Sequence, residues 1–565
     1  MTLNRLPAHG RCPFAFALVF ILAGALLPAS ARAAITSNGS VSPSPPQQAG
    51  ADPVIGVNDI GRFTITPSSV VNSDVATIGG QLTGIGYAVV SGFDTGTGSG
   101  AVWNTNSMVV GNSGTGTLEV LNGGVVTVDF LANPGTGDLI VGNVEDGVGT
   151  VVVRGRGSLL RIGDDTFIGH NDDDDDISGT GTLIIEDEGY VIGTNDAVTG
   201  TDVFNIGARG RVELSNGRLR TEVLNNSGAI VGSGRVDSAV TIANMVGGRF
   251  EVGPGQRMVV NGGEEGGVGL DNDGEVVAVG GAIEFLEPFV NSNAAAKVTL
   301  LNGVARFPRI GFGFDSTEGV LATTGGVNDI YGTVRIQGAS SRIVVAGESA
   351  AVFHDPVTNA GGVIEVFPGS SAVYLQGLTT TGSGSALVVH LADPDEDPDF
   401  GSLEVAGSAA LDGVLQVQLA SGFVPANGDS FPILTAAGGI SGSLSLASAP
   451  ALSSGLQWDL DVHSTTVVLS VTSTGDYNGN GVVDAADYVL WRKSLGQSGA
   501  GLAADGNGNG VVDAPDYDFW RARFGNVVAP GAGVGEIAAA VPEPATAMLL
   551  LAGLFFALRC RPIRC

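Results

Sequence analysis

Residues 110–124, VGNSGTGTLEVLNGG, decide the fold. A glycine turn leads into a short run in which Leu118 and Val120 alternate with polar residues, and a second pair of glycines ends it. Alternation with a period of two between glycine-rich turns indicates a half-buried β-strand. The phrase returns several times further along the chain, so it marks a repeating unit.

Two glycines mark each copy of this unit. The first follows a short apolar run, and its successive positions lie 31, 27, 38 and 25 residues apart. Self-similarity at such intervals, with short strands and no helical pattern, indicates stacked coils. We therefore predict an all-β body over residues 104–345, a right-handed parallel β-solenoid (β-helix) whose coils bury apolar side chains against one another. The repeat glycines are Gly111 with Gly116, Gly142 with Gly149, Gly169 with Gly181, Gly207 with Gly210, and Gly232 with Gly234.

The flanking segments are also rich in strand-like runs. Residues 34–103 are predicted to be an N-terminal β segment or cap. The repeat blurs from residue 251 onwards, but apolar runs persist, so residues 346–473 are predicted to be further β-solenoid or a C-terminal β cap. A stack exposes strand edges at its ends and needs such caps.

Composition and charge favour a folded extracellular protein. Of 565 residues, 89 are glycine, 43% are hydrophobic and only 15% are charged, which argues against disorder. Lys and Arg total 26 against 57 Asp and Glu, a net charge of -31 that disfavours a nucleic-acid partner. The three cysteines, Cys12, Cys560 and Cys565, lie near the termini, so no disulfide framework is expected in the body.

A second and sharper repeat lies towards the C-terminus. The segments DYNGNGVVDAADYVLWRKSLG from Asp476 and DGNGNGVVDAPDYDFWRARFG from Asp505 are 29 residues apart and share 14 of 21 positions. A calcium loop of the EF-hand type takes oxygens from positions 1, 3, 5, 9 and 12 and a carbonyl from position 7, with glycine at position 6. Both segments meet this pattern, so we predict two Ca²⁺ ions. The predicted ligands are Asp476, Asn478, Asn480, the Val482 carbonyl, Asp484 and Asp487 in the first loop, and Asp505, Asn507, Asn509, the Val511 carbonyl, Asp513 and Asp516 in the second.

Each loop is followed by a predicted helix, and no helical pattern directly precedes either loop. Tyr488, Trp491 and Leu495 predict an apolar stripe on the first helix, matched by Tyr517, Trp520 and Phe524 on the second. Over residues 474–527 the pattern resembles a type I dockerin, which implies a cohesin-like partner. Calcium could also serve only to fold so small a module, and that alternative stays open beside docking. The resemblance implies partner contacts by Ala485, Ala486, Arg492, Lys493, Ala514, Pro515 and Arg521.

Both ends of the chain are predicted to be targeting signals. Residues 1–33 combine basic residues, an apolar run and small residues before a cut site, as in a signal peptide. After a linker over residues 528–540, the tail 541–565 joins Val541, Pro542, Glu543 and Pro544 to a short apolar run and three arginines. This tail resembles the PEP-CTERM sorting signal, which implies an exosortase-type processing enzyme and a transient C-terminal membrane segment. A simple membrane anchor is the alternative.

The strand repeats resemble those of autotransporter passengers and of planctomycete-type surface proteins with the same dockerin and tail. We therefore expect an exported, non-catalytic structural or adhesive protein at the cell surface or in the extracellular space. The alternative is an enzyme, a lyase or hydrolase acting on extracellular polysaccharide. The acidic runs at 172–176 and 393–399, and His354 near Asp355, are candidates for a functional site. No catalytic residue is predicted among them.

Overall fold

A computed structural model of the protein describes ten segments. Within them the chain is nearly all β-structure, with two short helices after the last strand, which confirms the prediction of an all-β body and a small α module. The predicted signal peptide, linker and sorting tail lie outside the described residues. The described segments are residues 35–42, 52–129, 137–170, 179–193, 202–263, 269–309, 311–394, 400–453, 455–499 and 501–527.

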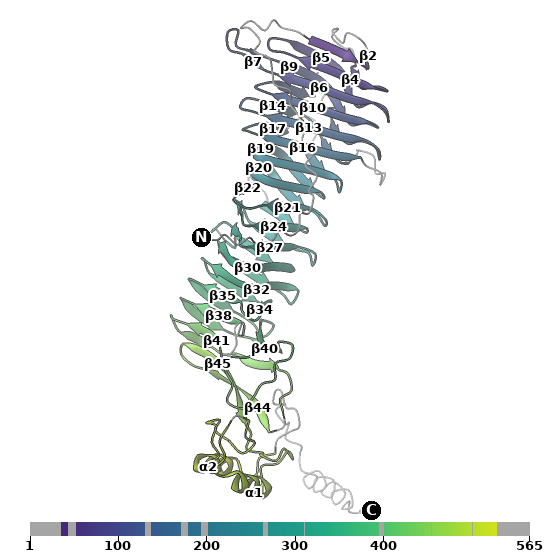
Figure 1. The fold of residues 1–565 in the computed structure, drawn as a ribbon. Helices are drawn as coiled ribbons and strands as arrows, with labels where there is room; N and C mark the ends of the chain where they lie inside the picture. The colour runs from purple at the N-terminus through teal and green to yellow at the C-terminus, as the bar shows by residue number, and fades with distance from the viewer. Residues whose placement is uncertain are drawn as a thin grey trace, which may run out of the picture.

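Layers of three strands build the body. Each strand pairs in parallel with its counterpart in the next layer, as when β10 pairs with β13, β11 with β14 and β12 with β15. Figure 1 shows these layers piled along one long axis, with the two helices at the far end. The first regular layers are β10 (Thr115–Leu121), β11 (Val125–Val128), β12 (Leu139–Val141), β13 (Val148–Arg154), β14 (Leu159–Ile162), β15 (Thr166–Ile168), β16 (Thr180–Glu186), β17 (Tyr190–Gly193) and β18 (Val203–Ile206).

Glycine is required where successive layers come closest. Gly116, Gly149, Gly181 and Gly210 face one another in consecutive layers, as the repeat predicts. A Cβ at any of these positions would overlap a backbone carbonyl of an earlier layer. The fifth copy departs from the prediction: Gly232 pairs with Leu214, 18 residues earlier, within the long strand β20 (Ala229–Asn244). This layer is shorter than those before it, and the register of the sequence pattern slips there.

In the later layers of the middle region, equivalent residues follow one another at nearly equal intervals. Val320, Arg342, Val363 and Ala386 pair in succession, 22, 21 and 23 residues apart, although the sequence repeat blurs there. The turn residues differ between these layers, but the alternation of apolar side chains persists. This part comprises β19 (Gly210–Asn226), β20 (Ala229–Asn244), β21 (Arg249–Val252), β22 (Arg257–Gly262), β23 (Gly269–Asn272), β24 (Glu275–Val279), β25 (Ala282–Phe285), β26 (Phe289–Asn291), β27 (Lys297–Leu301), β28 (Val304–Arg306), β29 (Phe314–Ser316), β30 (Gly319–Tyr331), β31 (Val334–Gln337), β32 (Ser341–Phe353), β33 (Val357–Ala360), β34 (Val363–Val366), β35 (Ser371–Tyr374) and β36 (Gly377–Thr380).

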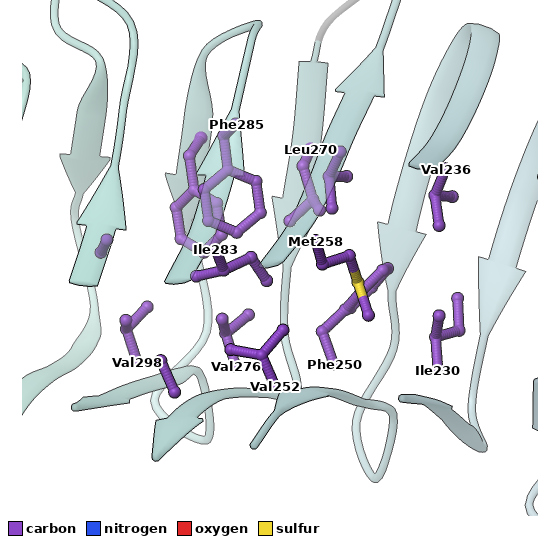
Figure 2. Close-up of a cluster of buried hydrophobic side chains, with 14 of the residues drawn as sticks. Ile230, Val236, Phe250, Val252, Met258, Leu270, Val276, Ile283, Phe285 and Val298 are labelled. Atoms are coloured by element: carbon purple, nitrogen blue, oxygen red, sulfur yellow. The ribbon is translucent and has the colours of Figure 1, made fainter. Parts of the chain in front are cut away.

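One continuous apolar interior runs through the layers. Figure 2 shows side chains such as Phe250, Met258 and Ile283 directed from successive strands into the same space, and all three are fully buried. Because alternate residues of a strand point to opposite faces, every second side chain reaches this interior and the others face outwards. Burial of such apolar surface is the main term that stabilises the stack.

Antiparallel strands cover both ends. At the N-terminal end β1 pairs antiparallel with β4, and at the C-terminal end β45 pairs antiparallel with both β41 and β44. These pairings occupy edges that would otherwise be open to another chain. The N-terminal strands are β1 (Ile35–Gly39), β2 (Val41–Ser42), β3 (Val54–Ile55), β4 (Ile60–Ile65), β5 (Val70–Ile78), β6 (Ile85–Ser91), β7 (Phe93–Asp94), β8 (Ser99–Gly100) and β9 (Val102–Val110). The C-terminal strands are β37 (Ala386–Leu391), β38 (Ser402–Val405), β39 (Ser408–Leu411), β40 (Val414–Leu419), β41 (Ser430–Ala436), β42 (Ile440–Gly442), β43 (Ser445–Ser448), β44 (Leu456–Val462) and β45 (Thr466–Ser473).

Candidate calcium-binding site

Two loop–helix units follow the last strand. The first loop starts at Asp476, three residues after β45, and leads into α1 (Ala485–Ser494); the second leads into α2 (Ala514–Arg523). Asp484 and Asp513 are the N-cap residues of these helices. The order is therefore strand, loop, helix, loop, helix, with no helix ahead of the first loop, as predicted.

The carboxylates at positions 1 and 12 organise the first loop. Asp476 accepts hydrogen bonds from the backbone amides of Asn480 at 3.1 Å and Gly481 at 2.7 Å. Asp487 accepts from the amides of Asn478 at 2.9 Å and Asp484 at 2.7 Å. The loop is thus wound around two carboxylates that come from its opposite ends.

The second loop repeats this network. Asp505 accepts from the amides of Asn509 at 3.1 Å and Gly510 at 2.7 Å. Asp516 accepts from the amides of Asn507 at 3.1 Å and Asp513 at 2.7 Å. The near-identity of the distances shows that the shared positions of the sequence specify one loop geometry twice.

Glycine permits the sharp turn inside each loop. Gly481 and Gly510, at position 6, have φ angles of 87° and 77°. L-residues with a side chain rarely adopt this left-handed region. Position 6 therefore has the left-handed backbone conformation for which the calcium-loop pattern requires glycine.

The buried carboxylates fit a hard cation such as Ca²⁺. Asp487 and Asp516 are fully buried, and Asp476 and Asp505 are nearly so. Burial raises the pKa of Asp487, and the negative charges of Asp476 and Asp484 raise it further. A bound cation would offset both effects, and an all-oxygen donor set suits calcium. Within the described residues, no three His, Cys, Asp or Glu side chains form a metal site by themselves; the predicted sets also contain asparagine and carbonyl oxygens.

Each unit holds the loop of the other. The indole Nε1 of Trp491 donates to the Asp513 carbonyl at 2.8 Å, and that of Trp520 donates to the Asp484 carbonyl at 3.0 Å. Likewise, the Val483 amide in the first loop donates at 2.8 Å to the Asn526 carbonyl, which follows α2. The two loops and the two helices therefore fold as one module. Sequence reasoning placed the tryptophans on an apolar stripe and missed this exchange.

The predicted stripes are wrong at their last positions. Trp491 and Trp520 are buried, but Leu495 is 44% exposed and Phe524 is 56% exposed. Both residues are C-caps, with ψ angles of 123° and 125°, so they have already left the helix. A spacing of seven residues does not bring a side chain back to the same face once the helix has ended.

The module also contacts the body. The Asn427 side-chain amide, from the turn before β41, donates to the Asp505 carbonyl at 2.6 Å. The Thr474 amide donates to the Gly455 carbonyl at 2.8 Å. The second calcium loop is therefore attached to the end of the stack as well as to the chain that precedes it. The sequence contained no signal for the Asn427 contact.

All seven residues predicted to contact a partner are exposed. They lie at the start and towards the end of each helix, and the Ala486 backbone amide donates to the predicted ligand Asp484 at 2.7 Å. Among the predicted ligands, the four aspartates at positions 1 and 12 are buried, whereas the four asparagines are exposed, as the predicted partner contacts are.

The paired loops, the buried carboxylates and the exposed helix faces define a calcium-dependent docking module. Residues 474–523 match the family of the dockerin type I domain, which confirms the dockerin prediction for this part of the chain. The domain supports Ca²⁺ as the ligand, a cohesin-like partner and an extracellular or cell-surface location. A comparison of the chain with curated proteins finds no match.

Of the other candidates, the structure describes His354 and Asp355 but few of the rest. The His354 imidazole contacts Asp329 of the preceding layer at 2.7 Å, whereas the neighbouring Asp355 accepts from Arg309 and from the Gly332 amide. The acidic run 172–176 and most of the run 393–399 lie outside the described residues, as do the sorting residues Val541, Pro542, Glu543 and Pro544. In the part of the chain that the structure describes, no helix is long and apolar enough to cross a membrane.

Proposed function

We propose that this protein is a non-catalytic structural or adhesive component of the cell surface or extracellular matrix. Its body acts as a rigid right-handed parallel β-solenoid, and its dockerin module attaches the body to a cohesin-like partner. The observation that carries the docking role is the duplicated loop network, in which four buried carboxylates organise two matching loops. In-register parallel pairing between layers supports the solenoid.

We further propose that the module binds two Ca²⁺ ions through the ligand sets predicted from the sequence. Asp484 and Asp513, at position 9, act directly or through water. The Asp513 Oδ1 atom is buried and accepts no hydrogen bond from the described residues, which supports a role as a ligand. The calcium ions fix the loop backbone, and this backbone in turn positions the starts of both helices.

The docking surface follows from the exposed residues of the two helices. Ala485 and Ala486 offer a small flat surface at the start of α1, and Ala514 and Pro515 offer its counterpart on α2. Basic side chains near the helix ends provide the charged contacts. Because Pro515 and Ala522 stand where the first unit has Ala486 and Lys493, the symmetry between the helices is broken, and we propose that the two faces bind a partner unequally.

The chain ends complete the proposal. A signal peptide exports the protein, and an exosortase-type enzyme processes the PEP-CTERM tail, so the membrane segment is transient. The repeats then serve as a spacer like those of autotransporter and planctomycete-type surface proteins. The high net negative charge suits an extracellular setting in which calcium is available.

Calcium titration of the mature chain tests the site. Replacement of both Asp476 and Asp505 by alanine should abolish the calcium-induced helical signal in circular dichroism and the retention of the chain on immobilised cohesin domains. Asp459→Ala is the matched control, because Asp459 is an exposed aspartate of β44 outside both ligand sets and the predicted partner contacts. An unchanged calcium response in the double variant would show that the ligand assignment is wrong.

The non-catalytic proposal has its own test. The mature chain is incubated with a panel of bacterial and algal polysaccharides, with and without calcium, and the release of sugar ends is measured. We expect no turnover above a heat-inactivated control. Turnover would instead favour the polysaccharide lyase or hydrolase.

A further inference from the structure

A groove of about 660 Å³ lies on the outside of the body, over β17, β19, β20 and β22. Its lining includes Tyr190, Arg218, Arg235 and Arg257, with Glu188 at one side. This gathering of arginines is unusual in a chain of net charge -31. The groove is far along the sequence from the dockerin module and has no part in the docking described above.

The layered register sets these side chains in a row. Tyr190 pairs with Arg218, and Arg218 pairs with Arg235, so the three occupy the same outward position in consecutive layers. Neighbouring strands are about 4.8 Å apart, which places one planar side chain at each step. The Arg218 guanidinium lies over the Tyr190 ring, 5.3 Å from its centroid.

A single buried carboxylate orients two of the arginines. The fully buried Asp237 accepts from Arg218 Nε at 2.8 Å and from Arg235 Nε at 2.6 Å. The lining carries three arginines and Glu188, and Asp237 lies beneath two of these arginines, so this group of side chains has an excess of one formal positive charge. Because Asp237 comes from the body's own β20, the two arginines are fixed in place before any ligand arrives.

The third arginine lies in the next layer but outside this row, because Arg235 pairs there with Val259, two residues after Arg257. Arg257 is 62% exposed and forms an ion pair with Glu284 of β25. An exposed pair of this kind contributes little to stability, so an incoming anion can compete for the guanidinium group at small cost. Arginine binds carboxylate and sulfate groups through two parallel hydrogen bonds, which suits it to such ligands.

We propose that this groove binds a segment of an acidic polysaccharide. The guanidinium groups of Arg218, Arg235 and Arg257 take the anionic substituents, and the Tyr190 ring packs against the apolar face of a sugar. The groove runs along the stack and is open to solvent, so a chain can continue past it in both directions. The inference adds a ligand for the body and does not depend on the dockerin.

Binding by the full mature chain tests the inference. Calorimetry is carried out with an oligogalacturonate, a chondroitin sulfate oligosaccharide and neutral cellohexaose. Binding of either acidic ligand, with at least tenfold weaker binding of the neutral one, supports the inference, and the preferred ligand identifies the anionic group. Equal binding of the neutral ligand, or no binding of either acidic one, would overturn it.

Variants connect the binding to the groove. The double variant Arg235→Gln with Arg257→Gln should weaken acidic binding at least tenfold, and Arg218 remains to pair with Asp237, so the fold is kept. The matched control is Arg62→Gln, since Arg62 lies over Tyr87 at 5.1 Å in the same kind of stacked pair outside the groove. Equal affinity in the double variant and in the control would place any binding elsewhere. Retention on cohesin should be unchanged in all of them, which separates this test from that of docking.

Discussion

Single residues of the calcium module differ between its two copies for a reason that the structure makes plain. Position 2 is Tyr477 in the first loop and Gly506 in the second. The Tyr477 hydroxyl donates to the Asp516 carbonyl at 2.8 Å, across to the other unit. A Cβ at Gly506 would overlap that hydroxyl. The second loop therefore has glycine at position 506, which leaves space for the Tyr477 side chain of the first loop to reach the Asp516 carbonyl.

Gly506→Ala should destabilise the calcium-loaded module by about 1–3 kcal/mol, the usual cost of overpacking a tight interior. Tyr477→Phe removes the hydroxyl, so the double variant should recover part of the loss although it lacks the hydrogen bond. Thermal unfolding of the four proteins at saturating calcium gives the coupling energy. Strictly additive effects would mean that the two residues do not contact each other as described.

At the scale of strands, a row of buried polar side chains crosses several layers. Asn226 donates its side-chain amide to Asn244, Asn244 to Asn272, and Asn272 to Asn291, at 2.8, 2.7 and 2.9 Å. All four are fully buried. Buried amides are stabilising when they are paired, and each side-chain Nδ2 of the row except that of Asn291 has an acceptor, so the row favours one register between layers.

Asn244→Ala should lower the free energy of unfolding by about 1–3 kcal/mol, because it leaves the amides on both sides of it without their partner. Asn225→Ala is the control, since Asn225 forms one side-chain hydrogen bond, to Asn205, in a more open setting. Hydrogen exchange of the surrounding strands measures the effect locally. An equal loss in both variants would argue against a cooperative row.

The Glu365 carboxylate, which links neighbouring strands, should make the stability of the body depend on pH. Desolvation alone would raise the pKa of Glu365, but hydrogen bonds from His390 and Arg342 outweigh it and the pKa lies below its ordinary value. A lowered pKa contributes stability that is present above the ordinary carboxyl range and is lost as the pH falls through the lowered value. Glu365→Gln should therefore be less stable than the parent chain near neutral pH. Denaturation across the acid range should show this difference shrinking; a constant gap would contradict the assignment.

The sequence predicted these elements unevenly. The two loop–helix units could be predicted from the sequence, because ligand chemistry restricts both the residue types and their spacing; the individual calcium ligands stay a prediction. The stacking of glycines from Gly116 to Gly210 could also be predicted from the sequence, because a side chain at these positions would overlap the backbone of the neighbouring layer. The glycine repeat no longer predicts the strand register at Gly232, where a layer is shorter. The layers after it could not be recognised from the sequence because their turn residues vary. Strand alternation survives such changes, but spacing measured between glycines does not.

For the whole molecule, the question is whether body and module behave as separate parts. Asn427 precedes β41 and its amide donates to the Asp505 carbonyl, while Asp505 itself is position 1 of the second loop. Such a contact links residues 78 apart in the sequence, so no local pattern could have predicted it. Because coupling between two sites is reciprocal, a ligand that orders this loop also stabilises the end of the stack. A change that stabilises the end of the stack likewise favours the ordered loop.

Asn427→Ala should consequently weaken calcium binding at the second loop while leaving the first loop unchanged. Loss of one hydrogen bond is worth about 1 kcal/mol, which corresponds to roughly a fivefold lower affinity. Calorimetric titration of the mature chain measures both sites, and Asn58→Ala, an exposed asparagine at the opposite end of the body, is the control. Calcium should also slow hydrogen exchange in β41 and β45 of the parent chain but much less in the variant, because the contact that carries the coupling is gone. If calcium protects these strands equally in both proteins, the second loop and the stack are coupled by another route, such as the Thr474–Gly455 hydrogen bond.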